Sequence, residues 1–168
     1  MKAKALLAAS LLAAASAVTG SAQTVYSVNA VGFVNAVFPP GFSLNCNPLD
    51  SGTNTVASLF PLPAVGTAVY IFNPASGGYD SASFGRAGWV NGALSLNPGV
   101  GFFYKNPTAT PVTNTYVGNV MQGTLSTPLA AGFTLVGSQV PQQGLVVTDL
   151  MLPFGVGDTV YQLSLIHI

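Results

Sequence analysis

Few side chains in this chain of 168 residues have groups that carry out catalysis. Hydrolysis by paired carboxylates needs two acids that face each other across a cleft. Asp50 and Asp80 instead lie in turn sequences, where aspartate bonds its own backbone. Glycine-rich phosphate loops, serine elbows and Cys/His clusters do not occur in the sequence. The sequence therefore predicts a protein that is not an enzyme, with no catalytic residue, metal ligand or bound cofactor. The acidic, thiol and imidazole side chains of the chain are Asp50, Asp80, Asp149, Asp158, Cys46 and His167.

Cys46 is the sole cysteine, so no disulfide can form within the chain. It alternates in phase with Phe42 and Leu44, while the residues between them are polar. A period of two places it on the face that carries the apolar side chains. A reactive thiol would need exposure and a positive neighbour. We therefore predict that Cys46 is buried and inert, and that Phe42 is a core residue.

Three aromatic residues, Tyr79, Trp89 and Tyr104, lie in parts of the chain rich in Gly, Ser and Asn. Two interpretations remain open for them. Exposed and coplanar, the rings would form a platform that stacks on sugar faces. Packed inside, they would be ordinary core residues, and this is the favoured interpretation because aromatic side chains in a charge-poor sandwich are mostly buried.

The elements that must position these residues repeat along the chain. Shifted by 91 positions, residues 32–70 match residues 123–161 without a gap, chiefly at glycines and large apolar residues, which shape turns and cores. The matched pairs are Gly32/Gly123, Gly41/Gly132, Phe42/Phe133, Leu44/Leu135, Val56/Val147, Leu59/Leu150, Val65/Val156, Gly66/Gly157, Val69/Val160 and Tyr70/Tyr161. The repeat predicts two similar units, with Phe42 and Phe133 in equivalent core positions.

Short apolar segments separated by proline and glycine predict an all-β fold, a sandwich or barrel-like module of about 91 residues in tandem, with the second copy truncated. Residues 55–60 and their counterparts 146–151 each predict one helical turn. Val56 and Leu59 would there share a side and plug the end of the module. The expected strands are 25–37, 41–45, 68–72, 78–84, 88–90, 100–105 and 112–117.

The order of several motifs resembles a family of uncharacterised exported bacterial proteins that carry such a module in tandem. The resemblance covers nearly all of the chain after its first segment. It implies an exported β module and no known activity. The motifs are GFSLxxNPL at 41–49, VASLFP at 56–61, VYxFN at 69–73, WV at 89–90, LNPGxGFFYKNP at 96–107 and YVGNVxQG at 116–123.

The two ends of the chain differ from the units between them. Lys2 and Lys4 precede an apolar run that small residues follow up to Ala22, which predicts a secretory signal peptide at 1–22. Residues 163–168, LSLIHI, resemble a translated adapter from sequencing-library preparation, so His167 is not expected to belong to the natural protein. The expected domains are the signal peptide, a first unit at 23–115, a truncated second unit at 116–162, and a tail at 163–168.

Beyond residue 22, two basic residues stand against four aspartates, a net charge of −2. So little positive charge excludes phosphate contacts with nucleic acid and a polybasic lipid site. No membrane span is expected once the signal peptide is removed. We expect an exported structural or adhesive module in the periplasm, on the cell surface or outside the cell, whose partner is a surface or extracellular polymer. The alternative is a carbohydrate-binding module that uses exposed aromatic residues.

Overall fold

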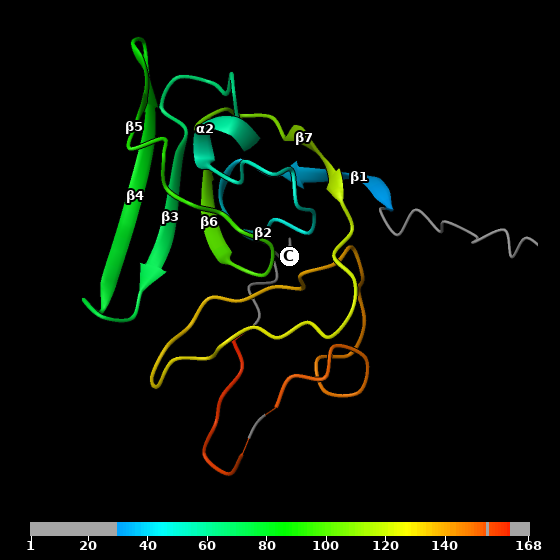
Figure 1. Cartoon of the computed structure of the whole chain (residues 1–168). Helices are drawn as coiled ribbons and strands as arrows, with labels where there is room; N and C mark the ends of the chain where they lie inside the picture. Colours follow the sequence, from blue (N-terminus) through cyan, green and yellow to red (C-terminus); the bar gives the residue numbers. More distant parts are fainter. Residues whose placement is uncertain (1–29, 154, 162–168) are drawn as a thin grey trace, which may run out of the picture.

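The computed structural model describes residues 30–153 and 155–161. The predicted signal peptide and the tail with His167 lie outside the described residues. The regular structure between them is almost entirely strand (Figure 1). Its elements are β1 (Val31–Phe38), β2 (Gly41–Cys46), α2 (Val56–Leu59), β3 (Ala68–Asn73), β4 (Gly78–Gly85), β5 (Gly88–Val90), β6 (Gly101–Asn106) and β7 (Val112–Asn119).

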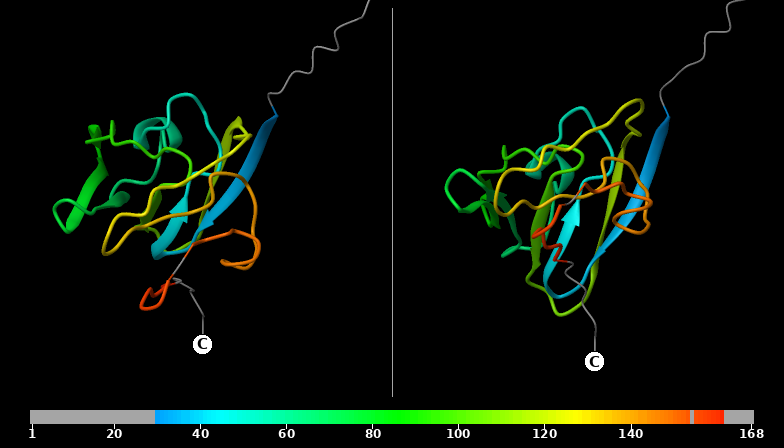
Figure 2. Two further views of the ribbon diagram at one scale, coloured as in Figure 1. Left: turned by 60° about the horizontal axis from the view of Figure 1, so that its bottom comes forward. Right: turned by 90° about the horizontal axis from the view of Figure 1, so that it is seen from below.

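Two antiparallel sheets pack together, so the predicted all-β fold is confirmed as a sandwich. One sheet pairs β1 with β7, and the other has the order β2-β6-β3-β4-β5. Because β1 leads into β2 and β6 leads into β7, the same two stretches of chain run side by side through both sheets. In Figure 2, β1 and β7 lie together at one side of the molecule. The chain therefore turns a corner twice, at residues 39–40 and at residues 107–111.

The buried side chain of Asn106 ties these two corners together. Its Nδ2 donates to the carbonyl oxygens of Phe38, at 3.0 Å, and of Thr110, at 2.9 Å. Its Oδ1 accepts from the backbone N–H and the hydroxyl of Thr108, at 2.9 and 2.7 Å. Buried backbone groups need hydrogen-bond partners. The Asn106 amide supplies such partners at both corners, where the two stretches of chain pass from one sheet to the other.

Asn-Pro pairs end three of the strands in the same way. The side-chain oxygens of Asn47, Asn73 and Asn106 each accept from the backbone N–H two residues further on, at 3.2, 3.0 and 2.9 Å. Proline has no N–H to continue a strand ladder, and asparagine supplies the turn bond instead. The same sequence signal therefore marks the ends of β2, β3 and β6.

Between the sheets, aromatic rings form the centre of the core. The ring of Phe38 lies 4.2 Å from that of Tyr104 and 5.7 Å from that of Phe60, measured between centroids. The short helix α2 begins with a capping box between Thr55 and Ser58 and buries Val56 and Leu59, as its sequence predicts. The further buried apolar residues include Leu49, Val69, Ala82, Leu96, Phe102 and Tyr116.

The prediction that Phe42 lies in the core is wrong. Phe42 is 50% exposed, whereas its polar neighbour Ser43 is only 7% exposed. Ser43 lies opposite Tyr104 and Asn45 lies opposite Phe102, so large rings on β6 already fill the interior. Strand β2 contributes small polar side chains inward, and these bond to each other, since Asn45 Nδ2 donates to Ser43 Oγ at 2.8 Å. Side chains on β2 alternate between two faces, as predicted, but Phe42 lies on the solvent side and Ser43 on the core side.

After β7 the described chain forms no named strand, and it runs as irregular segments below the sheets in Figure 1. Residues 146–149 form a hydrogen-bonded turn in which the Asp149 N–H donates to the Leu145 carbonyl oxygen at 3.0 Å, a single helical turn within the predicted segment. Phe133 is 69% exposed, so the prediction of a core position is wrong here too. Val160 and Tyr161 are exposed apolar residues. Gly41 and Gly132 both have a positive φ, at 83° and 89°, which is a shared turn feature, while the tandem repeat itself stays a prediction.

Replacing Asn106 by alanine is expected to lower the free energy of unfolding by about 3 kcal/mol, because buried backbone groups at both corners lose their partner. Asn73→Ala is the matched control, since Asn73 makes the same Asn-Pro turn at an exposed site. It is expected to cost less than about 1 kcal/mol. Urea unfolding followed by fluorescence measures both, and equal losses would contradict a special role for Asn106.

Candidate functional site

The three predicted aromatic residues are not brought together. Tyr104 is 3% exposed and belongs to the core, so the favoured core interpretation is confirmed for it and the alternative of a surface stacking residue is wrong. Trp89 on β5 is half-buried, and its Nε1 donates to the Phe60 carbonyl at 2.7 Å. Tyr79 on β4 is 53% exposed. A coplanar platform of these three rings does not form, and Tyr79 is the one member that faces solvent openly.

Tyr79 belongs to a different group of rings, on the face of the five-stranded sheet that points away from the core. Strand side chains alternate, so Phe103 lies on the side opposite the buried Phe102 and Tyr104. Tyr70 pairs with Phe103 across β3 and β6, and Phe72 pairs with Tyr79 across β3 and β4. Phe42 and Tyr79 are exposed and the others are half-buried. We call this group, Phe42, Tyr70, Phe72, Tyr79 and Phe103, the outer aromatic face.

The rings of the outer aromatic face contact one another at an angle. Centroid distances are 5.9 Å for Phe42 and Tyr70, 6.0 Å for Tyr79 and Phe103, and 5.5 Å for Phe72 and Tyr79. The planes of these three pairs are inclined by 45°, 63° and 72°. The Lys105 Nζ lies 6.0 Å from the centre of the Phe42 ring, within cation–π range. The face is thus an interlocked apolar surface edged by one cation rather than a flat stacking platform.

The periodicity of the sequence could not assign these residues to a surface. Residues 69–72 read Val-Tyr-Ile-Phe and residues 102–104 read Phe-Phe-Tyr, so both faces of β3 and β6 carry large apolar side chains. The polar residues of β2 carry more information than its apolar ones. Ser43 and Asn45 lie opposite the large rings of Tyr104 and Phe102, so small side chains on β2 mark the face that points into the core.

Asp50 acts as a turn residue, as predicted, whereas the prediction for Asp80 is wrong because it lies within strand β4. Asp50 Oδ1 accepts from the Asn54 side chain at 2.7 Å and from the Gly52 backbone at 2.8 Å. These two bonds hold the pKa of Asp50 below its ordinary value. Asp80 accepts from the Asn73 side chain at 3.0 Å. Within the described ranges, no group of three or more His, Cys, Asp or Glu side chains gathers in a way that could hold a metal ion.

Cys46 is half-buried rather than fully buried as predicted, and burial raises the pKa of its thiol. Its cover is not the core but the later part of the chain. A Cβ added at Gly137, its partner in the repeat, would clash with Cys46 Cβ and Sγ, and Cys46 Sγ lies 3.8 Å from the Ser138 carbonyl oxygen. Beside this contact, Gly101 N–H donates to Leu135 O at 3.1 Å. The later chain therefore docks on the sandwich through a small residue that accommodates the thiol.

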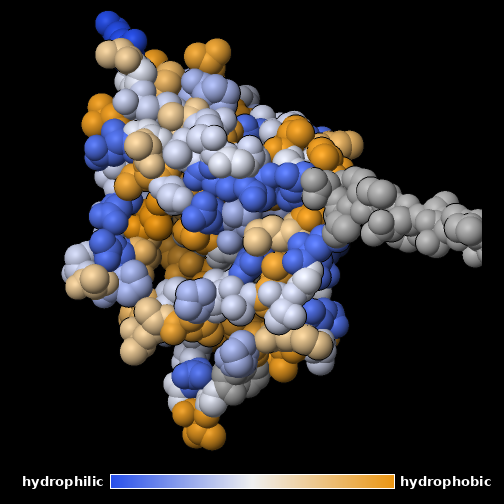
Figure 3. Space-filling view, viewed as in Figure 1, coloured by the Kyte–Doolittle hydropathy of each residue, from blue (hydrophilic) through white to orange (hydrophobic). Residues whose placement is uncertain are grey.

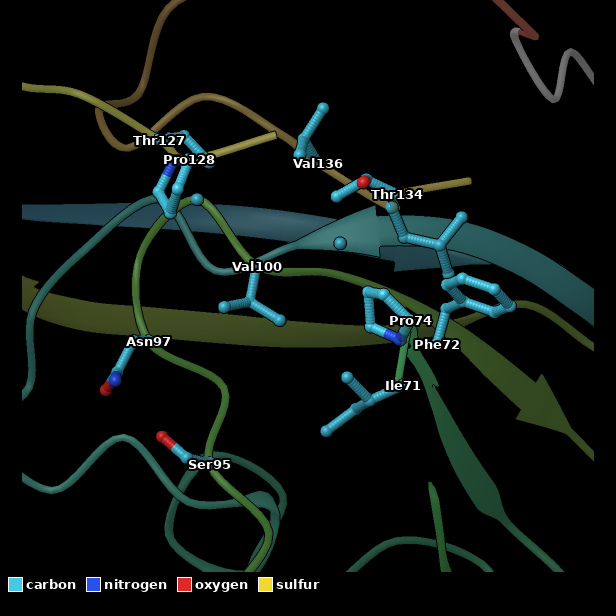
Figure 4. A pocket seen from close by; sticks show the side chains of 13 residues that line it. Ile71, Phe72, Pro74, Ser95, Asn97, Val100, Thr127, Pro128, Thr134 and Val136 are labelled. Atoms are coloured by element: carbon cyan, nitrogen blue, oxygen red, sulfur yellow. The ribbon is translucent and has the colours of Figure 1, made fainter. Parts of the chain in front are cut away.

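A groove of about 350 Å³ lies where this docking segment meets the sandwich (Figure 4). Its walls come from the end of β3, the start of β6 and residues 127–128 and 134–136. The side chains labelled in Figure 4 are apolar or neutral, among them Phe72, Val100, Thr134 and Val136. Without an ionisable group the groove offers no acid–base chemistry.

No protein-family model, curated protein or solved structure matches this chain, so the resemblance drawn from its motifs stays a prediction. None of the helical segments in the described part of the chain has the length and apolar character of a membrane span.

Gly137→Ala is expected to destabilise the protein by about 1–3 kcal/mol, because the new methyl group overlaps Cys46. Combining it with Cys46→Gly, which removes that side chain, should recover most of the loss. Gly155→Ala is the control, since a Cβ there meets Asp158 Oδ2 only at 4.0 Å. Urea unfolding of the single and double variants gives the coupling energy. Strictly additive losses would contradict the contact.

Proposed function

We propose that this chain is an exported, non-catalytic adhesive module that holds a surface or extracellular polymer through its outer aromatic face. The single observation that carries the proposal is the row of interlocked rings that β2, β3, β4 and β6 present to solvent. Export rests on the predicted signal peptide. In the space-filling view, hydrophobic side chains also lie at several places on the visible surface, between hydrophilic ones (Figure 3).

The energetics of the outer aromatic face suit binding. Soluble proteins seldom expose large contiguous apolar patches unless they bind something there. Phenylalanine and tyrosine bury much area on contact and lose little side-chain entropy. Here the loss is smaller still, because Phe72, Tyr79 and Phe103 already hold each other in place. Contact with an apolar partner is therefore favoured without any new ordering of the rings.

The position of the rings on the fold supports the same function. Strands β3 and β6 are the central strands of the five-stranded sheet, and their opposite side is packed into the core. A load applied to the outer aromatic face is thus borne by strands that are hydrogen-bonded to a neighbour on both sides. Lys105, above Phe42, adds one positive charge that suits a partner with scattered acidic groups.

Carbohydrate binding remains the second candidate, and it rests on Tyr79 alone. Its ring is the exposed member of the predicted set and would present one face to a sugar. Against it stands the inclination of its neighbours, Phe72 at 72° and Phe103 at 63°, which leaves no coplanar ring beside it.

Binding of the purified protein to phenyl-agarose, microcrystalline cellulose and chitin separates the two candidates. An adhesive apolar face predicts retention on phenyl-agarose, weakened about tenfold by Tyr79→Ser or Phe42→Ser, which corresponds to about 1.4 kcal/mol per ring. Phe33→Ser is the matched control, since Phe33 is an exposed phenylalanine on the other sheet.

Equal weakening by Phe33→Ser, or unchanged retention in the Tyr79 and Phe42 variants, would contradict adhesion through the outer aromatic face. Retention on cellulose or chitin that depends on Tyr79 but not on Phe42 would favour the carbohydrate-binding candidate instead.

A further inference from the structure

Strand β1 leaves one long edge of the sandwich open. The bond from Val120 N to Ala30 O, at 2.7 Å, continues the pairing of β1 with β7 and fixes its phase. In an antiparallel pair, alternate residues exchange both backbone bonds with the partner strand, and the residues between them direct their N–H and C=O groups the other way. On β1 the residues between are 31, 33, 35 and 37. Within residues 30–153 and 155–161, no hydrogen bond reaches their backbone groups.

The other sheet edges are short or covered. Asp50 exchanges backbone bonds with Asn119 at 2.9 and 2.8 Å and so covers the end of β7. Strand β5 has only three residues, and the end of β2 is met by the later chain, where Gly137 contacts Cys46. By contrast, β1 has eight residues and contains neither a charged residue nor a proline. Proteins commonly protect an edge with such residues or with a cover, so the open edge of β1 suits the addition of a strand.

The strand that completes this edge comes from another molecule. Every named strand of the described chain is already paired in its own sheet, and the described residues after β7 form no named strand. A second β1 fits the edge. Laid antiparallel about Val34, it brings residue 31 opposite residue 37 and residue 33 opposite residue 35, so all the outward backbone groups find partners in phase.

The side chains of β1 are compatible with this self-pairing. In the register about Val34, Val31 of one copy lies opposite Val37 of the other, and Phe33 lies opposite Asn35. The side chains of all these residues are exposed in the single chain. Paired valines gain contact, and without charges on the strand no like charges meet across the two copies.

We propose that two copies of this chain pair through β1, antiparallel and about a two-fold axis at Val34. The two small sheets then join into one sheet of order β7-β1-β1-β7. Because each copy uses the same edge, both open edges are consumed and the assembly closes at two copies. The outer aromatic face lies on the five-stranded sheet and stays free, so the pairing does not depend on the adhesive function.

Sedimentation equilibrium of the purified protein tests the assembly. The expected result is a monomer–dimer equilibrium with a Kd of about 100 μM or tighter. A monomer at about ten times that concentration would overturn the proposal and leave the edge to a strand of a different protein. A mass beyond that of a dimer would also overturn it, because isologous pairing leaves no further edge of this kind.

Hydrogen exchange at residue resolution tests which edge is used. In the dimer, the amides of residues 31, 33, 35 and 37 should be protected, and this protection should disappear on dilution below the Kd. The amides of residues 32, 34 and 36 bond to β7 and should stay protected at both concentrations. Protection of the first set that does not change with concentration would contradict pairing through β1.

Charge variants test the register. Val31→Lys combined with Val37→Lys places lysines opposite each other across the two copies and should weaken the dimer at least tenfold. Val31→Lys combined with Val37→Glu places opposite charges there and should restore it. The two positions lie at opposite ends of β1, so the rescue cannot arise within one copy.

Val90→Lys combined with Val117→Lys is the matched control. It adds the same charge at exposed valines away from the open edge, and it should dimerise as the unaltered protein does. All the replaced side chains are exposed, and urea unfolding verifies that each variant is folded. Equal weakening by the control, or no recovery in the Lys/Glu variant, would overturn the proposed pairing.

Discussion

The sandwich depends on one buried amide, that of Asn106, at the corner where two antiparallel stretches of chain pass from one sheet to the other. Its bonds to the carbonyl oxygens of Phe38 and Thr110 keep β1 and β7 together after they leave β2 and β6. Phe38 at this corner packs against Tyr104 with 4.2 Å between the ring centroids, and both rings belong to the buried core. A corner without such an amide would leave backbone groups unpaired inside the protein.

The filling of that core also accounts for the surface. Because Phe102 and Tyr104 occupy the interior from β6, the facing positions on β2 hold the small polar residues Ser43 and Asn45. Phe42 must then lie on the solvent side, where it meets Tyr70 and Lys105. The outer aromatic face is thus a direct consequence of how the inside is packed, and the proposed adhesive role draws on a surface that the fold holds rigid.

Much of the fold could be predicted from the sequence, and the site could not. The strands at β2 to β6 and the turn at α2 were predicted within about one residue, because Asn-Pro pairs and glycines mark their ends. The sequence did not predict which face of each strand points into the core. Residues 70–72 and 102–104 are all large and apolar, so both faces of β3 and β6 look alike. The described chain after β7 forms no named strand, and it meets the sandwich through an isolated bridge between Val100 and Val136, backbone bonds beside that bridge and the contact of Gly137 with Cys46.

Thiol labelling of two neighbouring positions on β2 tests most directly the claim that the aromatic side of this strand faces solvent. With Cys46→Ala as the background, Phe42→Cys and Ser43→Cys place a thiol on opposite sides of the strand. The account predicts that the thiol at position 42 reacts with a soluble thiol reagent about as fast as in the unfolded chain, while the thiol at position 43 reacts far more slowly. Fast labelling at position 43 with protection at position 42 would place the aromatic side inside the sandwich and contradict the account.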